Sequence, residues 1–420
     1  MSVLSARKEL NALWTTTGSA AARTPRHTGS LSIRVAGPLR GHREQNGIKI
    51  SSASASSLQF RSSGRPQWSS AVRCQAAAES GDFRKRKPED ISVMVAGGTG
   101  YIGRAVVNEL VSRGYNTIVL SREKSGIGGA DGKAETIRRF DGAKVEFGDV
   151  TDTTSLKTAL GNHKVDVFVS CLASRTGGKK DSWLIDYQAT RNCMDEAISA
   201  GASHFVLLSA ICVQKPLLEF QHAKLKFEDE LMASKDITHS IVRPTAFFKS
   251  LAGQVESVKK GGPYVYFGEG DLCACKPISE RDLAAFIADC VQEESKINKM
   301  LPIGGPGKAY TPKEQADLLF GLMGEKPKYF PVPVSLMDGI IGIFEFLSRW
   351  FPNLEDTAEF GKIGKYYATE SMLVYDPATG TYDADATPEY GKDTLESFFK
   401  NALEKGLEGQ ELGDQAVFKK

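Results

Sequence analysis

The first 74 residues contain almost no acidic side chains. They hold eleven Lys and Arg and fourteen Ser, but only Glu9 and Glu44 as acids, and they show little apolar periodicity. The absence of an apolar core excludes a secretory signal peptide, whereas an Arg- and Ser-rich, acid-poor segment is typical of an organelle transit peptide. Because residues 72–78 resemble a chloroplast processing site, we predict a chloroplast transit peptide over 1–74, with cleavage near Cys74. Mitochondrial import and a disordered tail of other purpose are the alternatives.

From residue 75 onward the chain has no excess of positive charge. It carries 42 basic and 49 acidic residues there, a net charge of −7. The polar stretch 75–90 is expected to be a linker, and its basic run, Arg84 to Lys87, is short and balanced by acids. Because no basic face interleaved with aromatic residues is present, a nucleic-acid partner is not expected.

No apolar run reaches the roughly 18–20 residues that span a bilayer. The longest candidate, 332–351, is interrupted by Asp338, Glu345 and Arg349. A core helix is the default expectation for it. The alternatives are an amphipathic helix that lies on a thylakoid or envelope membrane, or one that lines an apolar pocket.

Cysteine is scarce and scattered after the N-terminal segment. Six remain, in apparent strands and helices: Cys171, Cys193, Cys212, Cys273, Cys275 and Cys290. This distribution favours reduced core thiols over a disulfide framework. No second Cys or His pair stands near Cys273 and Cys275 at ligand spacing, so we expect no metal site.

What the sequence does contain is a glycine motif between a short strand and a helix. The strand 91–97 ends at a turn, and a helix over about 101–113 follows. The glycines fit both G-x-G-x-x-G and G-x-x-G-x-x-G, which bring backbone amides and a helix N-terminus to a pyrophosphate. The predicted dinucleotide-binding residues are Gly97, Gly98, Thr99, Gly100, Tyr101, Ile102 and Gly103. A glycine-rich turn in an ordinary α/β protein is the alternative.

Strands and helices alternate along the following 200 residues. Strands are expected at 117–122, 144–150, 165–173, 204–210 and 240–245, with helices near 134–140, 153–160, 186–200 and 217–234 between them. This order predicts an α/β protein with a doubly wound parallel sheet. We assign 91–310 to this Rossmann domain and 311–420 to a smaller C-terminal region, which begins with a capping box at Thr311 and Glu314.

Basic residues follow the second strand, where a dinucleotide-binding fold places the adenosine ribose. An acid there binds the 2′-hydroxyl of NAD, whereas an arginine accommodates the 2′-phosphate of NADP. Arg122 stands at this point, and Arg104 adds charge beside the third glycine. We therefore predict NADPH as the cofactor; surface basic residues on a loop are the alternative. Other cofactor contacts are expected at the strand ends, near Asp149, Val150, Ala173 and Pro244.

These features together resemble the atypical, extended branch of the short-chain dehydrogenase/reductase superfamily. That family pairs a serine at the end of the fifth strand with Tyr-x-x-x-Lys on the next helix, and the tyrosine donates a proton. Here Ser209 and Lys224 occupy these places, but Phe220 stands where the tyrosine is expected. Because a phenyl ring has no proton to give, reduction of a carbonyl group by the usual acid is in doubt. Reduction of a conjugated carbon–carbon double bond needs less acid assistance, and the resemblance implies that Lys224 binds the cofactor or supplies a proton.

Residues 90–412 closely resemble the chloroplast 8-vinyl reductases of divinyl chlorophyllide found in plants and green algae. The resemblance is carried by 170–174, 180–183, 207–221, 243–249, 273–279, 359–364 and 408–412. It implies NADPH-dependent reduction of the 8-vinyl group of divinyl chlorophyllide or protochlorophyllide to ethyl, in the chloroplast stroma. It also implies that the C-terminal region covers a flat apolar macrocycle.

Two other functions remain compatible with these residues. One is a reductase of the same branch that acts on another small conjugated substrate. The other is a non-catalytic, NADPH-binding chloroplast assembly factor, in which Phe220 marks lost catalysis. Arg175, Lys179 and Lys180 either pair with a substrate carboxylate or form a solvated loop, and His222 is expected to be a half-exposed helix residue.

Overall fold

The computed structural model describes residues 82–407, apart from 126–128, 130, 162 and 352–353. Its main sheet consists of seven parallel strands: β1 (Ser92–Ala96), β2 (Asn116–Ser121), β3 (Lys144–Phe147), β4 (Val167–Ser170), β5 (His204–Leu208), β6 (Thr238–Pro244) and β8 (Lys299–Ile303). Their order is β3-β2-β1-β4-β5-β6-β8, so the strand order reverses direction between β1 and β4. The predicted doubly wound parallel sheet is confirmed. The predicted transit peptide and the linker up to residue 81 lie outside the described residues.

Alternate residues of the strands supply the two layers of the core. Val93 and Val95 face one layer, and Met94 and Ala96 face the other. Strands buried on both faces are expected to be almost wholly apolar, as β4 and β5 are. Helices α3 (Tyr101–Ser112) and α11 (Glu280–Gln292) cover the first face. Helices α5 (Thr153–Leu160), α7 (Thr190–Ser199) and α8 (Glu219–Ala233) cover the second.

Most predicted elements occur close to their expected positions, with two notable differences. The fourth strand ends at Ser170 rather than at residue 173, although the apolar run continues through Ala173 after the chain has left the sheet. The helix expected over 186–200 begins earlier, with α6 (Lys179–Asp181) followed by a π-helical stretch, η4 (Ser182–Ala189). Single π-helical segments inside helices often mark functional sites. Helix α4 (Lys133–Arg139) lies between β2 and β3 in the chain.

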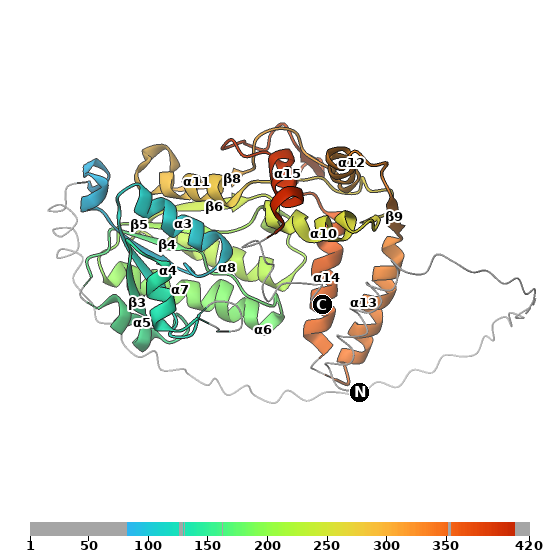
Figure 1. The fold of residues 1–420 in the computed structure, drawn as a ribbon. Helices are drawn as coiled ribbons and strands as arrows, with labels where there is room; N and C mark the ends of the chain where they lie inside the picture. Colours follow the sequence, from blue (N-terminus) through green and yellow to red (C-terminus); the bar gives the residue numbers. More distant parts are fainter. Residues whose placement is uncertain (1–81, 126–128, 130, 162, 352–353, 408–420) are drawn as a thin grey trace, which may run out of the picture. The chain divides into compact units, whose positions relative to one another are not determined.

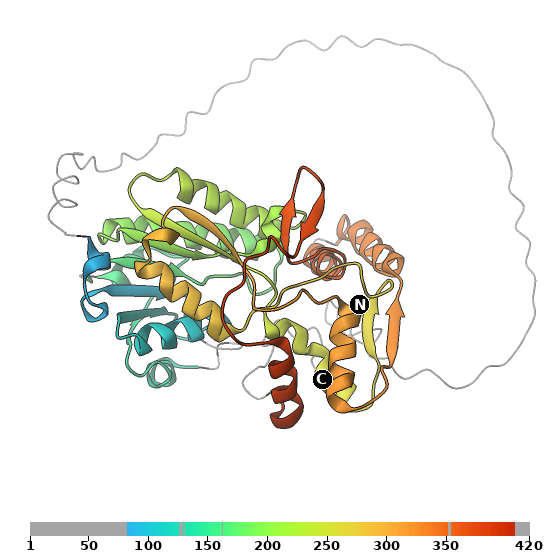
Figure 2. The ribbon, with the colours of Figure 1, turned by 90° about the horizontal axis from the view of Figure 1, so that it is seen from above.

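A second core joins residues from before and after residue 310. It combines α9 (Phe248–Leu251), α10 (Val255–Lys259) and β7 (Tyr264–Phe267) with α12 (Pro312–Met323) and α15 (Leu395–Lys405). Strand β7 pairs in parallel with β9 (Tyr329–Val332), apart from the main sheet (Figure 2). The predicted capping box is confirmed, since Thr311 Oγ1 accepts from the Glu314 amide at 3.2 Å and Glu314 accepts from the Thr311 amide at 2.9 Å.

Two further helices and a hairpin complete the C-terminal region. Helix α13 (Val334–Ser348) packs beside α14 (Glu355–Thr369), as Figure 1 shows. Strands β10 (Val374–Asp376) and β11 (Thr381–Asp383) form an antiparallel hairpin. Among the described helices, none combines the length and apolar character needed to cross a membrane.

Candidate active site

The glycine turn joins β1 to α3 in a geometry that side chains would obstruct. Gly97 has φ +75°, and a Cβ there would lie 2.6 Å from the carbonyl oxygen of Cys171. A Cβ on Gly103 would overlap the carbonyl oxygen of Gly97. Gly100 is the N-cap residue of α3. The structure describes every residue of the first turn of this helix, and none of them is acidic. The first amides of this helix therefore present donors and positive potential to an anion.

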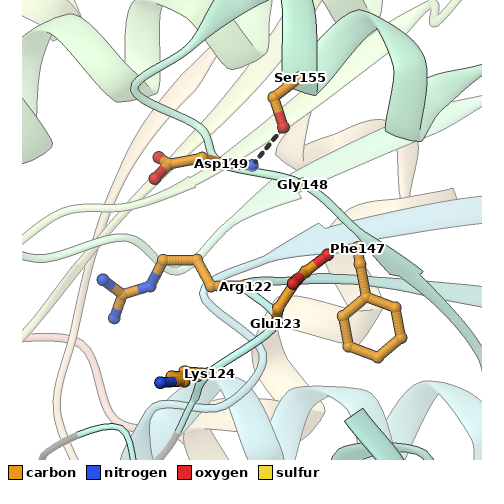
Figure 3. Close-up of a pocket in the computed structure, with 7 residues that line it drawn as sticks. All are labelled: Arg122, Glu123, Lys124, Phe147, Gly148, Asp149 and Ser155. Atoms are coloured by element: carbon orange, nitrogen blue, oxygen red, sulfur yellow. Dashed lines mark hydrogen bonds between the residues drawn. The ribbon is translucent and has the colours of Figure 1, made fainter. Parts of the chain in front are cut away.

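A cavity of about 410 Å³ lies at the carboxyl ends of β2 and β3. It is lined by Arg122, Glu123, Lys124, Phe147, Gly148, Asp149 and Ser155. Arg122 and Lys124 extend toward one side of it, while the carboxylate of Glu123 points away from them (Figure 3). Glu123 pairs instead with Lys133 at 2.8 Å. In the described part of the chain neither Arg122 nor Lys124 forms an ion pair, so both charges face solvent or a ligand.

Asp149 is fixed by its own turn. Its carboxylate accepts hydrogen bonds from the amide and the hydroxyl of Thr151, at 2.8 and 2.7 Å. Burial alone would raise the pKa of Asp149, but these hydrogen bonds and the charge of Arg122 hold that pKa below its ordinary value. The next residue, Val150, is held through its carbonyl oxygen, which accepts from Asn192 at 3.0 Å.

Arg104, which was predicted with Arg122 to bind the 2′-phosphate, lies outside this cavity. It stands on α3, half-buried, and does not line the cavity that contains Arg122. Its charge instead lowers the pKa of Tyr101, although burial and Glu280 together raise that pKa above its ordinary value. The Tyr101 hydroxyl donates to Glu280 at 2.7 Å. The structure therefore does not bring Arg104 and Arg122 together in this cavity, and the role of Arg104 stays a prediction.

The other predicted residues follow parallel strands and so share one edge of the sheet. Ala173 is exposed just beyond β4, and Pro244 is buried at the end of β6 beside Ile303. Ser209, one residue after β5, is 4% exposed and donates its hydroxyl to Glu228. This edge, where the strand order reverses, is where open α/β sheets bind ligands.

Glu228 is itself a buried anion on α8. It is fully buried and forms an ion pair with Arg243 on β6. With the Arg243 guanidinium and the Ser209 hydroxyl, Glu228 has the partners that a buried carboxylate requires. The hydroxyl of Ser209 is therefore engaged in the interior, and a catalytic role for it stays a prediction.

Lys224 lies on α8 and points toward the π-helical stretch. Its ammonium is 3.0 Å from Asp186, and both side chains are nearly buried, at 9% and 1% exposure. Asp186 also accepts from the amide of Ser174, beyond β4, at 3.3 Å. Burial raises the pKa of the Cys171 and Cys212 thiols, and the nearby positive charge of Lys224 partly offsets this by lowering the pKa of both. The pair thus holds one cation at the carboxyl edge of the sheet.

Helix α14 of the C-terminal region packs over the start of α8. Glu359 accepts from the amide of Glu219 at 2.9 Å, and Lys215 pairs with Glu370 at 2.7 Å. Tyr366 donates its hydroxyl to the carbonyl oxygen of Cys212 at 2.9 Å. Phe220 packs against the apolar cluster that contains Tyr366 and Cys212. Side chains of α14 therefore pack beside Phe220, the residue that stands where the tyrosine is expected.

The polar residues of the loop after β4 are partly engaged. Lys179 lies 3.6 Å from both Glu219 and Glu355, while Lys180 is exposed. His222 is exposed on α8. Within the described part of the chain, the six cysteines are free and buried, and no three His, Cys, Asp or Glu side chains gather to hold a metal ion.

Two residues near Lys224 were missed by the sequence analysis. Asp186 lies 38 positions before Lys224 in the chain, and Tyr367 approaches Cys212 from 155 positions away. No sequence motif predicts a contact between residues that are so far apart in the chain. The one available signal was the strand–helix order, which brings residues just beyond β4 and β5 to a common edge.

The fold and the site together define a nicotinamide-dinucleotide-binding protein of the Rossmann type. Residues 97–294 match a family model described as NAD(P)H-binding. Among solved structures, the fold is similar to that of an Escherichia coli NADPH-dependent quinone oxidoreductase, with a TM-score of 0.53 and 16% identity. That likeness covers 74% of this chain and all of the quinone oxidoreductase.

Sequence comparison is more specific. The chain is 62% identical over 342 residues to the chloroplastic divinyl chlorophyllide a 8-vinyl-reductase of Cucumis sativus, covering 80% of this chain and 82% of that protein. It is 60% identical over 345 residues to the protein of the same name from Arabidopsis thaliana, covering 80% and 83%. The chain therefore belongs to the family of chloroplastic divinyl chlorophyllide a 8-vinyl-reductases.

Proposed function

We propose that this protein reduces the 8-vinyl group of divinyl chlorophyllide or protochlorophyllide to ethyl, with NADPH as the hydride source, in the chloroplast stroma. The observation that carries this proposal is the high identity to 8-vinyl-reductases over about four-fifths of both chains. That span is too long to be a cofactor-binding motif alone. It must include most of the elements that pack around the carboxyl edge of the sheet.

The glycine turn fits a pyrophosphate, because a Cβ at Gly97 or Gly103 would collide with backbone. The preference for NADPH over NADH is supported by Arg122 and Lys124, which have no ion-pair partner among the described residues and line one cavity. These two cations would hold a 2′-phosphate, since a phosphate is recognised by charge-assisted hydrogen bonds. Bound NADPH would supply the hydride; the protein supplies binding, orientation and the exclusion of water.

Lys224 would hold the nicotinamide ribose, and Asp186 would orient Lys224. Their separation of 3.0 Å in a nearly buried setting supports this division of roles. Ser209 would act as a positioning residue, because its hydroxyl is committed to Glu228. Phe220 fits a reaction that has no carbonyl oxygen to protonate.

The C-terminal region would cover the macrocycle from the side of α14. Helix α13 adds an apolar surface, since Ile343, Phe346, Trp350 and Phe351 are 60–75% exposed on it and just beyond it. We propose that this surface contacts the thylakoid or envelope membrane, from which an apolar substrate would be taken up. Sedimentation with chloroplast-lipid vesicles tests this contact.

The test of the reaction uses purified protein, divinyl chlorophyllide, and either NADPH or NADH. The expected result is a blue shift of the Soret band, a mass gain of two hydrogens, and faster turnover with NADPH. If NADPH binds but neither the band nor the mass changes, the protein is not this reductase, and a non-catalytic role as an assembly factor is favoured instead.

A further inference from the structure

Tyr367 is a half-exposed tyrosine of α14 whose hydroxyl lies among the groups around Lys224. The residue is 47% exposed, while its neighbour Tyr366 is buried. The Tyr367 hydroxyl lies 4.0 Å from the thiol of Cys212, the second residue of a short 3₁₀ helix that follows β5. A ligand at the carboxyl edge of the sheet would therefore have access to this phenol.

Lys224 and Asp186 act on the same small group of side chains. The charge of Lys224 acts on the Cys212 thiol, and the charge of Asp186 acts on the Tyr367 phenol. Although about half of the side chain is exposed, its hydroxyl end is shielded from water. This shielding, followed by Cys212, Tyr366 and Asp186, raises the pKa of Tyr367 well above its ordinary value. The phenol therefore stays protonated at neutral pH and has a proton to donate.

The neighbouring polar groups are already engaged or face away. Tyr366 donates to the carbonyl oxygens of Cys212 and Lys215, at 2.9 and 3.1 Å. Ser209 donates to Glu228. Loss of a proton from Lys224 would leave Asp186 as a buried, uncompensated anion, which is costly. His222 is exposed on α8. In contrast, the hydroxyl of Tyr367 has only a weakly accepting thiol as its partner among the described residues.

The position of Phe220 makes this phenol significant. Phe220 occupies the helix position four residues before Lys224, and it packs against the cluster that contains Tyr366 and Ile363 of α14. Tyr367 belongs to the same helix, one residue beyond Tyr366. The C-terminal helix thus brings a phenol to the neighbourhood from which α8 lacks one.

We propose that Tyr367 is the proton donor of the vinyl reduction, an inference that rests on the function proposed above. The hydride, with its electron pair, forms a C–H bond to one vinyl carbon as the C=C π bond breaks. The O–H bond of Tyr367 breaks, and its proton forms a C–H bond at the other carbon. The vinyl group is reduced to ethyl, NADPH is the species oxidised, and the phenolate regains a proton from water.

The experiment compares the full-length wild type with the Y367F and Y366F variants, using NADPH and divinyl chlorophyllide. We expect Y367F to lower kcat by about 100-fold or more, because positioned general acids contribute about 10²–10⁴-fold. Its KM, its NADPH affinity by fluorescence and its thermal stability should stay close to the wild-type values. The matched control Y366F removes two structural hydrogen bonds, so it should lower stability but keep kcat within about threefold.

A titration without cofactor or substrate gives a second readout. The ultraviolet spectrum of the wild type minus that of Y367F isolates the ionisation of this phenol, which should occur at higher pH than that of an ordinary tyrosine. If Y367F does not fold, 3-fluorotyrosine at position 367 keeps the hydroxyl and lowers its pKa; the loss of kcat with rising pH should then begin at lower pH.

The outcomes separate this proposal from the proposed function. If the wild type does not reduce divinyl chlorophyllide, the proposed function fails and the role of Tyr367 fails with it. If the wild type is active and Y367F keeps kcat within about threefold, only the role of Tyr367 is refuted. An unchanged pH profile for the fluorinated protein refutes it as well.

Discussion

Arg122 offers the sharpest test of cofactor choice. The side chain is exposed, forms no ion pair with a described residue, and shares its cavity with Lys124. We expect R122A to weaken the binding of NADPH selectively, because only NADPH carries the 2′-phosphate that this guanidinium would contact. The binding of NADH, which lacks the phosphate, should be nearly unchanged.

The magnitude follows from the interaction that the substitution removes. A hydrogen bond to a charged group contributes about 1.5–3 kcal/mol, and each 1.4 kcal/mol corresponds to a factor of about ten in Kd. Lys124 remains in the variant and continues to attract the phosphate. We therefore expect the Kd for NADPH to rise by about 10- to 100-fold, with a smaller effect at high salt because the site is exposed.

Fluorescence titration with NADPH and NADH at two salt concentrations measures this effect. The matched control is R138A, which removes an arginine from α4 that is 80% exposed, pairs with Glu135 and does not line the cavity. That variant should bind both cofactors like the wild type. Equal weakening of NADPH and NADH by R122A would refute the assignment of this cavity to the 2′-phosphate.

Three further predictions concern buried ionisable groups. K224M should weaken NADPH binding about tenfold and lower kcat, because it removes the cation paired with Asp186; full activity with unchanged NADPH affinity would contradict the role of Lys224. R243M should lower the free energy of unfolding by about 3–5 kcal/mol, since Glu228 would remain buried without its cation. Chemical denaturation measures that loss, and the control E228L/R243M should recover most of it. Finally, burial, with the charges of Arg84 and His239, lowers the pKa of His204 to about 3. Folding therefore keeps this ring neutral, and its contribution to stability is complete above about pH 6.5 and falls by at most about 1.4 kcal/mol per pH unit as the pH drops toward 3. Denaturation of H204Q at several pH values should show a shallower acid slope; an unchanged slope would contradict the assignment.

Local pattern was sufficient for most of the fold. The apolar strands, the helix periodicity, the glycine turn and the Thr311 capping box depend on interactions within a few residues, so the sequence displays them directly. The alternation of strands and helices then leaves few topologies, and the observed order β3-β2-β1-β4-β5-β6-β8 is one of them. The fourth strand was predicted too long because its apolar run continues after the chain has left the sheet.

The site was only partly predictable, because its partners are distant in the chain. The sequence by itself determined the dinucleotide turn at Gly97–Gly103, the basic residue at Arg122 and the loss of a phenol at Phe220. Tertiary structure alone decided that Lys224 is paired with Asp186, that Ser209 is held by Glu228, and that Tyr367 lies against Cys212. Such contacts depend on how the π-helical stretch and α14 pack against α8, and packing between elements leaves no periodic trace in the sequence.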